Sequence, residues 1–563
     1  MSAFAVNAGR PVDRGEARLL GSGLAALVLF LTVFVLLPLG TILLRSLYDR
    51  EDVFVGLANF RAFLATPALM ESVRTSLTLS LLTTAIVVPL AFAYAFALTR
   101  TAMPGKGLFK ILAQIPILAP SLLPAIALVY LFGNKGLLRD WLLGHSIYGP
   151  VGIVMGEVFY TFPHAVMILI VALSTADARL YEAAEALGAG RLRRFLTITL
   201  PGARYGLISA VFVVFTLVIT DFGVPKVIGG STNVLATDVY KQVVGQQNFG
   251  MGAVVGMVLL IPAVLAFVAD WIGQRRQMAL LSARSVPYAP RRQPLGDALA
   301  MLFCIAVAGV LLGILGTAGF ASFVTLWPYN LSLTLANYDF AELDSAGWAS
   351  YGNSLRLAAW TALAGTAVVF LGAWLVERSP AARGLAGVVR FAAIVPLAVP
   401  GMVLGLAYIF FFNAPWNPLG VLYHGMAILV LSTVVHFYTV GHLTAVTALK
   451  QLDREFEAVS ASLKVPVWRT FWRVTVPLCL PAILDIAIYL FVNAMTTVSA
   501  VVFLYAPDTK PASVAVLTMD DAGEVAGAAA MAMMIVYTSA GVRLLHAALG
   551  WGLGRRTQAW RAR

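Results

Sequence analysis

A polar stretch between long apolar runs, Glu182–Pro201, holds residues whose types suit ionic and docking contacts. It carries carboxylates and three arginines, which can form charge-assisted hydrogen bonds with a partner. Apolar residues recur at helical spacing on one face before Gly188 and on another after it, at Leu180, Ala184 and Leu187 and at Leu192, Phe195, Leu196 and Thr199. Since glycine can end or bend a helix without a Cβ penalty, we predict two short amphipathic helices at a membrane surface, joined at Gly188.

Polar residues inside apolar runs form a second group of candidates. Glu157 and Asp485 lie within such runs, Asp221 lies near the end of one, and Asn493 and Thr496 add a polar stripe beside Asp485. Ionisable groups are costly in hydrocarbon and are often part of a transport path. The alternative is that each carboxylate pairs with a buried hydroxyl or amide or lies at the interface, and that small-residue packing explains the stripe. The five residues are candidates for a translocation path, with that alternative open.

Motifs for catalysis, phosphate binding and metal binding are missing from the sequence. Gly105-Lys106-Gly107 lacks the upstream glycine and the following hydroxyl residue of a phosphate-binding loop. Cys304 and Cys479 form no close-spaced pair, and the histidines lack the spacing of metal ligands on a helix. We therefore expect no enzyme activity, no cofactor and no metal in this chain. A transporter driven by ATP would need separate subunits that bind it.

The elements that position these residues must be membrane helices. The chain is 60% hydrophobic and only 12% charged over 563 residues, with continuous apolar runs of about 20 residues. The run after Arg10, Arg14 and Arg18 is too long for a signal peptide, so we expect an uncleaved first span. We predict about twelve spans, at 20–44, 73–98, 108–132, 149–173, 206–228, 250–272, 297–320, 353–376, 388–412, 425–448, 480–505 and 525–549.

The net charge of +12 reflects orientation in the membrane and not nucleic-acid binding. The basic residues cluster in short loops beside the apolar runs, and such residues favour the cytoplasmic side. With the N-terminus inside, most of the 39 Lys and Arg residues fall in cytoplasmic segments. We therefore predict that both termini are cytoplasmic.

An internal repeat divides the chain. Leu57-Ala58-Asn59-Phe60 recurs 278 residues later as Leu335-Ala336-Asn337-Tyr338, and Thr75-Ser76-Leu77 matches Asn353-Ser354-Leu355 at the same displacement. Two prolines spaced by four residues, Pro116 and Pro120, return as Pro396 and Pro400. Six spans in each half make the halves parallel in the membrane. We predict an N-terminal repeat at 1–272, a cytoplasmic linker at 273–295 and a C-terminal repeat at 296–563.

The repeat predicts a second polar loop in the C-terminal half, and Phe456–Pro477 has the expected position and periodicity. Counted back from Pro477, Lys464 stands where the first loop has Gly188, and Ala458 stands where it has Glu182, with Glu457 one residue early. Lysine lacks the conformational freedom of glycine. We therefore expect the second loop to make a weaker docking contact than the first.

The spacing of the first loop resembles the EAA loop of permease subunits from bacterial ATP-binding-cassette (ABC) importers. The matching positions are Glu182, Ala183, Ala184, Gly188, Ile198, Leu200 and Pro201. The resemblance implies an all-α polytopic protein of the bacterial inner membrane, with two parallel six-helix repeats. It also implies that the two loops dock onto two ABC ATPase subunits and that a periplasmic substrate-binding protein delivers the substrate. A basic interfacial helix that holds lipid head groups is the alternative for the loop alone.

Two fused permease halves resemble the iron(III) and 2-aminoethylphosphonate branch of these importers. Asp221–Gly252 and Leu490–Asp521 look closer to the aminoethylphosphonate members, which implies that substrate, with iron(III) as the alternative. A gradient-driven secondary transporter with two parallel halves is the rival from another class, but it would not explain the paired amphipathic loops. A membrane-embedded enzyme would need a histidine or carboxylate cluster, and none is visible in the sequence.

Overall fold

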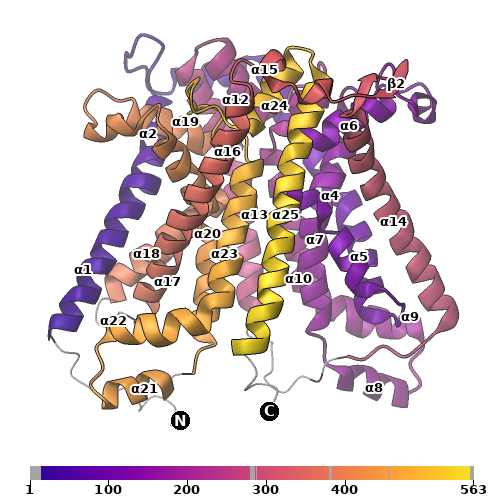
Figure 1. Ribbon diagram of the computed structural model, residues 1–563, viewed down its shortest axis with the longest axis vertical. Helices are drawn as coiled ribbons and strands as arrows, with labels where there is room; N and C mark the ends of the chain where they lie inside the picture. Colours follow the sequence, from indigo (N-terminus) through magenta and orange to yellow (C-terminus); the bar gives the residue numbers. More distant parts are fainter. Residues whose placement is uncertain (1–13, 279–285, 287, 379–382, 454, 558–563) are drawn as a thin grey trace.

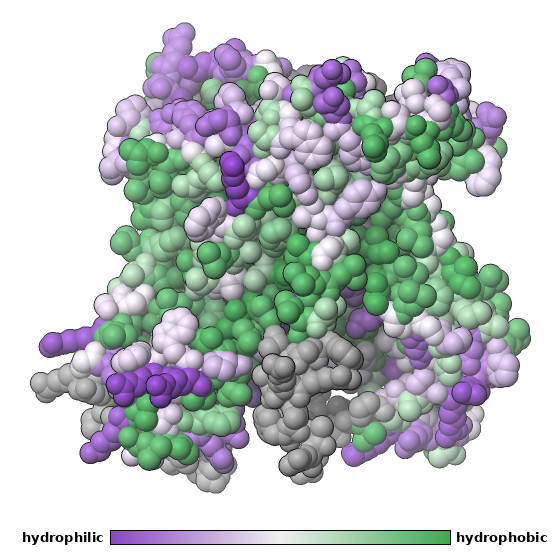
Figure 2. Space-filling view, in the orientation of Figure 1, coloured by the Kyte–Doolittle hydropathy of each residue, from purple (hydrophilic) through white to green (hydrophobic). Residues whose placement is uncertain are grey.

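The computed structural model describes residues 14–278, 286, 288–378, 383–453 and 455–557. Within these ranges, ten helices are long and apolar enough to cross a membrane, and two bent helix pairs raise the number to as many as twelve. An apolar band crosses the middle of the molecule, with polar side chains gathered above and below it (Figure 2). The predicted all-α polytopic membrane fold is therefore confirmed.

The first repeat consists of helices joined mostly by short connections. They are α1 (Arg14–Leu31), α2 (Leu37–Arg45), α3 (Ala58–Ala65), α4 (Pro67–Arg100), α5 (Lys106–Leu112), α6 (Leu122–Phe132), α7 (Pro150–Ser174), α8 (Ala178–Ala186), α9 (Arg191–Arg194), α10 (Leu200–Thr220), α11 (Gly223–Ile228), α12 (Leu235–Tyr240) and α13 (Phe249–Met278).

The second repeat follows the same plan and adds a small antiparallel hairpin after its first helix. Its elements are α14 (Pro294–Ala321), β1 (Val324–Leu326), β2 (Asn330–Leu333), α15 (Phe340–Leu343), α16 (Trp348–Trp360), α17 (Thr366–Arg378), α18 (Arg383–Ala398), α19 (Gly401–Phe412), α20 (Met426–Lys450), α21 (Glu455–Ser462), α22 (Val467–Thr470), α23 (Val476–Thr496), α24 (Ala512–Asp521) and α25 (Val525–Thr557).

The predicted spans 108–132 and 388–412 each correspond to a pair of helical segments with a sharp bend between them, which the sequence analysis did not predict. The helical segments on either side of the break meet at 98° in the first repeat and at 115° in the second. Pro120 and Pro400 lie at the two breaks. Proline lacks an N–H and disfavours a helical conformation in the residue before it, so the repeated proline motif explains the repeated bend.

The predicted sequence repeat corresponds to repeated hydrogen bonds. The Asn59 side chain donates to the carbonyls of Ser46 and Tyr48, at 2.9 and 2.8 Å. Asn337, its counterpart, donates in the same way to the carbonyls of Ser322 and Val324, at 3.0 and 2.9 Å. Each asparagine thus satisfies carbonyls just beyond the first membrane helix of its repeat.

The matched serines also act alike, because each accepts a hydrogen bond at the start of a short helix. Ser76 Oγ accepts from the amide of Leu235, which begins α12, and Ser354 Oγ accepts from the amide of Ala512, which begins α24. Both bonds measure 2.8 Å. The second span of each repeat therefore holds the short helix that follows its fifth span.

The first helix of each repeat packs against the other repeat. α1 and α2 lie along α17, α18 and α19, whereas α14 lies along α4, α5 and α6 (Figure 1). In one contact across this boundary, the Tyr408 hydroxyl donates to the Phe34 carbonyl at 2.7 Å. The two sequence repeats are therefore interlocked in space.

The two polar loops lie at one end of the molecule, which we call the loop end. It holds α8, α9, α21 and α22, together with the start of α1 and the end of α25, whereas α12, α15, α24 and the hairpin lie at the far end (Figure 1). Residues 1–13 and 558–563 and linker residues 279–285 and 287 lie outside the described residues. Which end faces the cytoplasm stays a prediction.

Replacing Asn59 or Asn337 with alanine should lower the free energy of unfolding by about 1–3 kcal/mol, because two backbone carbonyls lose their donor. Chemical denaturation of the purified protein in detergent measures this. Leu335→Ala is the matched control, because Leu335 is 71% exposed two residues before Asn337. Equal stability of all three variants would show that these bonds do not hold the repeat ends.

Candidate coupling loops and translocation path

The first loop is a helix–turn–helix held by local hydrogen bonds. The Asp177 carboxylate caps α8 by accepting from the amide of Arg179 at 3.1 Å. The helix ends at Gly188, whose φ is +71°, and the Ala189 amide donates to the Ala184 carbonyl at 2.9 Å. A left-handed residue followed by this bond across six residues is a Schellman motif, which glycine favours.

The second loop makes the same turn without a glycine. Lys464 has a φ of +53°, and the Val465 amide donates to the Ser460 carbonyl at 3.0 Å. Lysine therefore does not prevent this turn, although it lacks the conformational freedom of glycine. The backbone bonds that stabilise the turn outweigh a cost of about 1–2 kcal/mol for a left-handed residue with a Cβ.

The predicted second amphipathic helix of each loop is not a separate element. α9 continues through a π-helical turn, Phe195–Thr199, into α10, and α22 continues through Phe471–Thr475 into α23. Helices of 30 residues, Arg191–Thr220 and Val467–Thr496, therefore run from each loop into the membrane region, and the predicted spans 206–228 and 480–505 began too late. Each loop therefore joins a span through one continuous helix.

Both loops leave large apolar side chains exposed at matched positions. Leu187 and Leu463 precede the two turns and are 86% and 70% exposed. The pairs Leu180 and Phe456, Leu192 and Trp468, and Leu196 and Trp472 are also exposed, each pair separated by 276 residues. Such patches at a polar end of the molecule are typical of surfaces that bind another protein.

The residues that carry the EAA resemblance differ in their surroundings. Glu182, Ala183 and Pro201 are exposed, while Ala184 and Ile198 are partly buried. Glu185, which the sequence did not single out, pairs with Arg291 at 2.8 Å and Arg194 at 3.6 Å. These partners come from the linker and from α9, so no helical spacing could have indicated the network. In the second loop, the backbones of Glu457 and Ala458 belong to α21, and Pro477 begins α23.

The end of the linker packs on the first loop. The Val286 carbonyl accepts from the amide of Ala178 at 2.9 Å, and the rings of Tyr181 and Tyr288 lie 4.7 Å apart. Arg100, at the end of α4, places its guanidinium 5.1 Å from the Tyr181 ring centre and 4.7 Å from that of Tyr288. Cation–π contacts of this kind fasten the linker to the loop.

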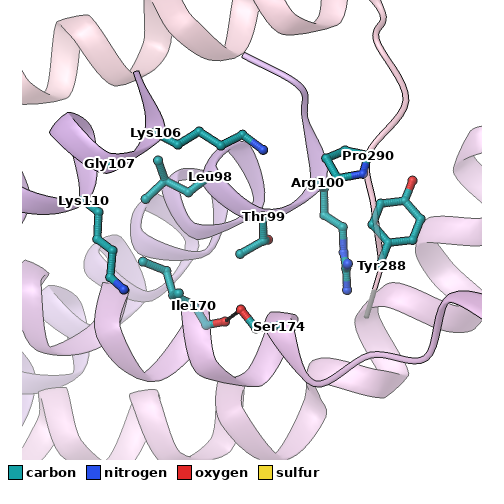
Figure 3. Close-up of a pocket in the computed structure, with 10 residues that line it drawn as sticks. All are labelled: Leu98, Thr99, Arg100, Lys106, Gly107, Lys110, Ile170, Ser174, Tyr288 and Pro290. Atoms are coloured by element: carbon teal, nitrogen blue, oxygen red, sulfur yellow. Dashed lines mark hydrogen bonds between the residues drawn. The ribbon is translucent and has the colours of Figure 1, made fainter. Parts of the chain in front are cut away.

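Arg100 and Tyr288 also stand on one side of a cleft of about 430 Å³, with Lys106 and Lys110 on the other (Figure 3). Thr99 and Ser174 lie between them, and the lining contains three cations but no carboxylate. With no acid–base pair or nucleophile activated by a base, this surface can bind but does not have the composition of a catalytic site.

Glu157 and Asp221 come together in the membrane region. Glu157 on α7 is fully buried, and neither carboxylate oxygen has a hydrogen-bond partner among the described residues. Its carboxyl group interacts with that of Asp221, the residue that ends α10 and accepts from the Val224 amide at 2.8 Å. Tyr160, one turn along α7, interacts with both carboxyl groups and with Tyr489 of α23.

The other three candidates for the translocation path, Asp485, Asn493 and Thr496, have partners other than Glu157 and Asp221. The Asp485 side chain is 61% exposed and pairs with His546 of α25 at 3.2 Å. Asn493 donates to the Tyr489 carbonyl at 2.7 Å, and Thr496 donates to the Val492 carbonyl at 3.1 Å. The Asn493 and Thr496 side chains are therefore hydrogen-bonded within their own helix.

At the far end, two ion pairs hold the loops of the repeats. Lys226 of α11 pairs with Asp521 of α24 at 2.8 Å and so joins the two repeats. Asp344 pairs with Lys510, and both side chains are buried. Among the acidic residues of the segment Ala321–Gly352, Asp344 is buried, whereas Asp339 and Glu342 are exposed.

Comparison with known proteins identifies the family. The family described as binding-protein-dependent transport system inner membrane component matches residues 88–277 and 381–551, which together exceed half of the chain. The chain belongs to this family. It is a multi-pass inner-membrane permease of an ABC importer with two fused copies of the family domain, and it is a transport component rather than an enzyme.

Relatives match across nearly the whole chain. A ferric transport system permease protein, FbpB, of Actinobacillus pleuropneumoniae is 29% identical over 540 residues, covering 93% of this chain and 77% of the relative. A second FbpB protein, of Haemophilus influenzae, is 30% identical over 516 residues, covering 89% and 80%. The spermidine/putrescine permease PotB of Escherichia coli is 27% identical over 266 residues and covers 45% of this chain but 96% of the relative, as expected for one repeat.

Exchanging the residues at the two turns should exchange their stabilities. Lys464→Gly should raise the free energy of local opening of α21 by about 1 kcal/mol and so slow its hydrogen exchange. Gly188→Lys should lower that free energy in α8 by about the same amount and so speed its exchange. A Cβ at Gly188 would have no atom within 4 Å, so the expected cost is conformational rather than steric. Hydrogen–deuterium exchange by mass spectrometry measures both variants. Unchanged exchange in α8 would contradict the glycine-dependent turn.

Asp520 should make stability depend on pH. Burial raises the pKa of Asp520 to about 6, with repulsion from Asp521 adding to the shift and Lys226 opposing it. A carboxyl with a raised pKa favours the folded state when protonated, so this contribution is lost as pH rises from about 4 through 6. Asp520→Asn should therefore raise the unfolding temperature at pH 7.5 but not at pH 4. A gain of equal size at both values would exclude this cause.

Proposed function

We propose that the chain is the permease of an importer for iron(III), driven by two separate ABC ATPase subunits and loaded by a periplasmic binding protein. The observation that carries the substrate is the likeness to two ferric transport permeases over about nine-tenths of the chain. It supports the iron(III) alternative better than the 2-aminoethylphosphonate expected from Asp221–Gly252 and Leu490–Asp521. The carboxyl pair of Glu157 and Asp221 adds support, since it would attract a cation.

In this proposal the exposed apolar residues of α8 and α21 dock on the ATPase subunits. ATP binding brings the subunits together and moves the two loops with them. Because the long helices that contain α10 and α23 begin in the loops, the movement reaches the spans without passing through a flexible joint. At the other end of the first of these helices lies Asp221, so the same movement changes its position relative to Glu157.

The binding protein would dock at the far end, on a surface that includes Asp339 and Glu342. Its contribution must differ between the two conformations of the permease, because a ligand that binds both equally shifts neither. The binding site for ATP lies in the partner subunits, and the permease itself needs no cofactor. One transport cycle then consists of docking of the loaded binding protein, ATP binding to the partner subunits, and opening of the translocation path toward the loop end.

Uptake by the assembled importer tests the substrate. The permease, its ATPase subunits and its binding protein are reconstituted in proteoliposomes with radioactive iron(III) on the binding protein. We expect uptake that requires ATP and is not reduced by excess 2-aminoethylphosphonate. Uptake of the phosphonate alone would reverse the substrate assignment. Iron uptake that follows a proton or sodium gradient without ATPase subunits would exclude an ABC importer.

Charge introduced on the exposed loop faces should release the ATPase. Leu187→Asp or Leu463→Asp should weaken binding by about 2 kcal/mol or more, roughly thirty-fold, because each leucine offers an apolar anchor. Co-purification of the ATPase with each variant measures this. Leu335→Asp is the control, with a similarly exposed leucine at the far end. If all three variants retain the ATPase equally, the loops are not its docking surface.

A further inference from the structure

Glu157 is a fully buried acid whose side chain interacts with a second carboxyl group. Its side chain is fully enclosed in α7, and neither carboxylate oxygen accepts a hydrogen bond from any described residue. A buried carboxylate without a donor is costly, and more so in a membrane, where water cannot compensate. A proton on the carboxyl group or a cation bound beside it would remove this cost.

The neighbour of Glu157 is a second carboxyl group and not a cation. Asp221 interacts with it and is itself held by the Val224 amide at 2.8 Å and by Ser121. Ionised carboxylates accept hydrogen bonds but cannot donate them, so two that face each other require a proton or a cation between them. The segments meet closely here, since a Cβ at Gly223 would lie 2.1 Å from Ser121 Oγ.

The second repeat shows that the fold itself does not need this acid pair. α7 and α20 are both 25 residues long and begin 276 residues apart, and α10 and α23 are both 21 residues long at the same displacement. In that register Thr433 replaces Glu157 and Thr497 replaces Asp221. The Thr433 hydroxyl group donates a hydrogen bond to the Leu429 carbonyl at 2.7 Å, within its own helix. The same architecture therefore forms without carboxylates, which points to a function specific to the first repeat.

The tyrosine side chains that interact with the carboxyl pair offer only oxygen atoms as possible ligands for a cation. Tyr160 interacts with both carboxyl groups and also with Tyr489, which comes from α23 of the other repeat. Carboxylate oxygens favour hard cations, and phenolate oxygens are hard donors as well. Among the described residues, no three or more His, Cys, Asp or Glu side chains are placed to hold a metal ion by themselves, so the two tyrosines would complete the set. Such a site suits passage, which requires that the ion also leave.

We infer that Glu157 and Asp221, with the hydroxyl groups of Tyr160 and Tyr489, form a transient site for a trivalent, oxygen-preferring cation in the membrane interior. That iron(III) passes between the repeats at this site rests on the proposed function. Asp221 ends the helix that begins in the first coupling loop, whereas Glu157 lies on a different helix. Movement of the loop would therefore separate the carboxyl groups and release the ion.

Terbium(III) is a suitable probe, because a trivalent ion bound beside tyrosine emits light when the tyrosine is excited. We expect saturable tyrosine-sensitised emission from the purified permease in detergent, reduced at least tenfold by Glu157→Gln and by Tyr160→Phe. Glu71→Gln is the control, since the Glu71 side chain is 65% exposed on α4. Glu157→Gln should leave the unfolding temperature unchanged or higher, because it removes an unpartnered charge. Emission that is the same in Glu157→Gln would overturn the site.

Iron(III) uptake separates this inference from the proposed function. Glu157→Gln and Asp221→Asn should each lower uptake at least tenfold while the ATPase still co-purifies, and uptake within twofold of wild type in both would overturn the site. If the wild-type importer carries no iron(III) but terbium emission still depends on Glu157, the proposed function fails and the cation site stands.

Discussion

The absence of water in the membrane interior is the constraint on which the rest of this structure depends. Polar groups in the spans must find partners within the protein, and most do so locally: hydroxyls donate to the preceding helical turn, and Asn59 and Asn337 close the ends of the first helices. Against that background, Glu157 stands out because its partner is another carboxyl group. In the proposed function, the transported cation would supply the positive charge that these two carboxyl groups lack.

The two repeats solve the same structural problem with different residues. Both bend their third span at a proline, both end a loop helix in a left-handed residue and both pass through a π-helical turn into a long span. Glycine makes the turn at 188 and lysine at 464, which shows that the surrounding hydrogen bonds and not the side chain alone determine the backbone there. Differences between the repeats therefore indicate function better than their similarities do.

Much of this architecture could be predicted from the sequence, because long apolar runs and a shared displacement each have one simple physical cause. The breaks at Pro120 and Pro400 were not predicted, since hydropathy does not register a bend within an apolar run. Asp485 and Glu157 looked alike in sequence, yet one is exposed beside His546 and the other is enclosed. Which face of a helix meets another depends on packing between distant segments, and the network of Glu185 with Arg291 has the same origin.

In the proposed mechanism, ATP moves the loops and, through them, the helices that begin there. Spin labels at Thr197 and Arg473, which are exposed at matched positions, measure the separation of the two loops. The native cysteines, Cys304 and Cys479, are buried and leave such labelling specific. Pulsed electron paramagnetic resonance of the assembled importer should show the distance shorten when ATP binds and stay constant in the permease alone. A distance that ATP does not change in the assembled importer would contradict the account.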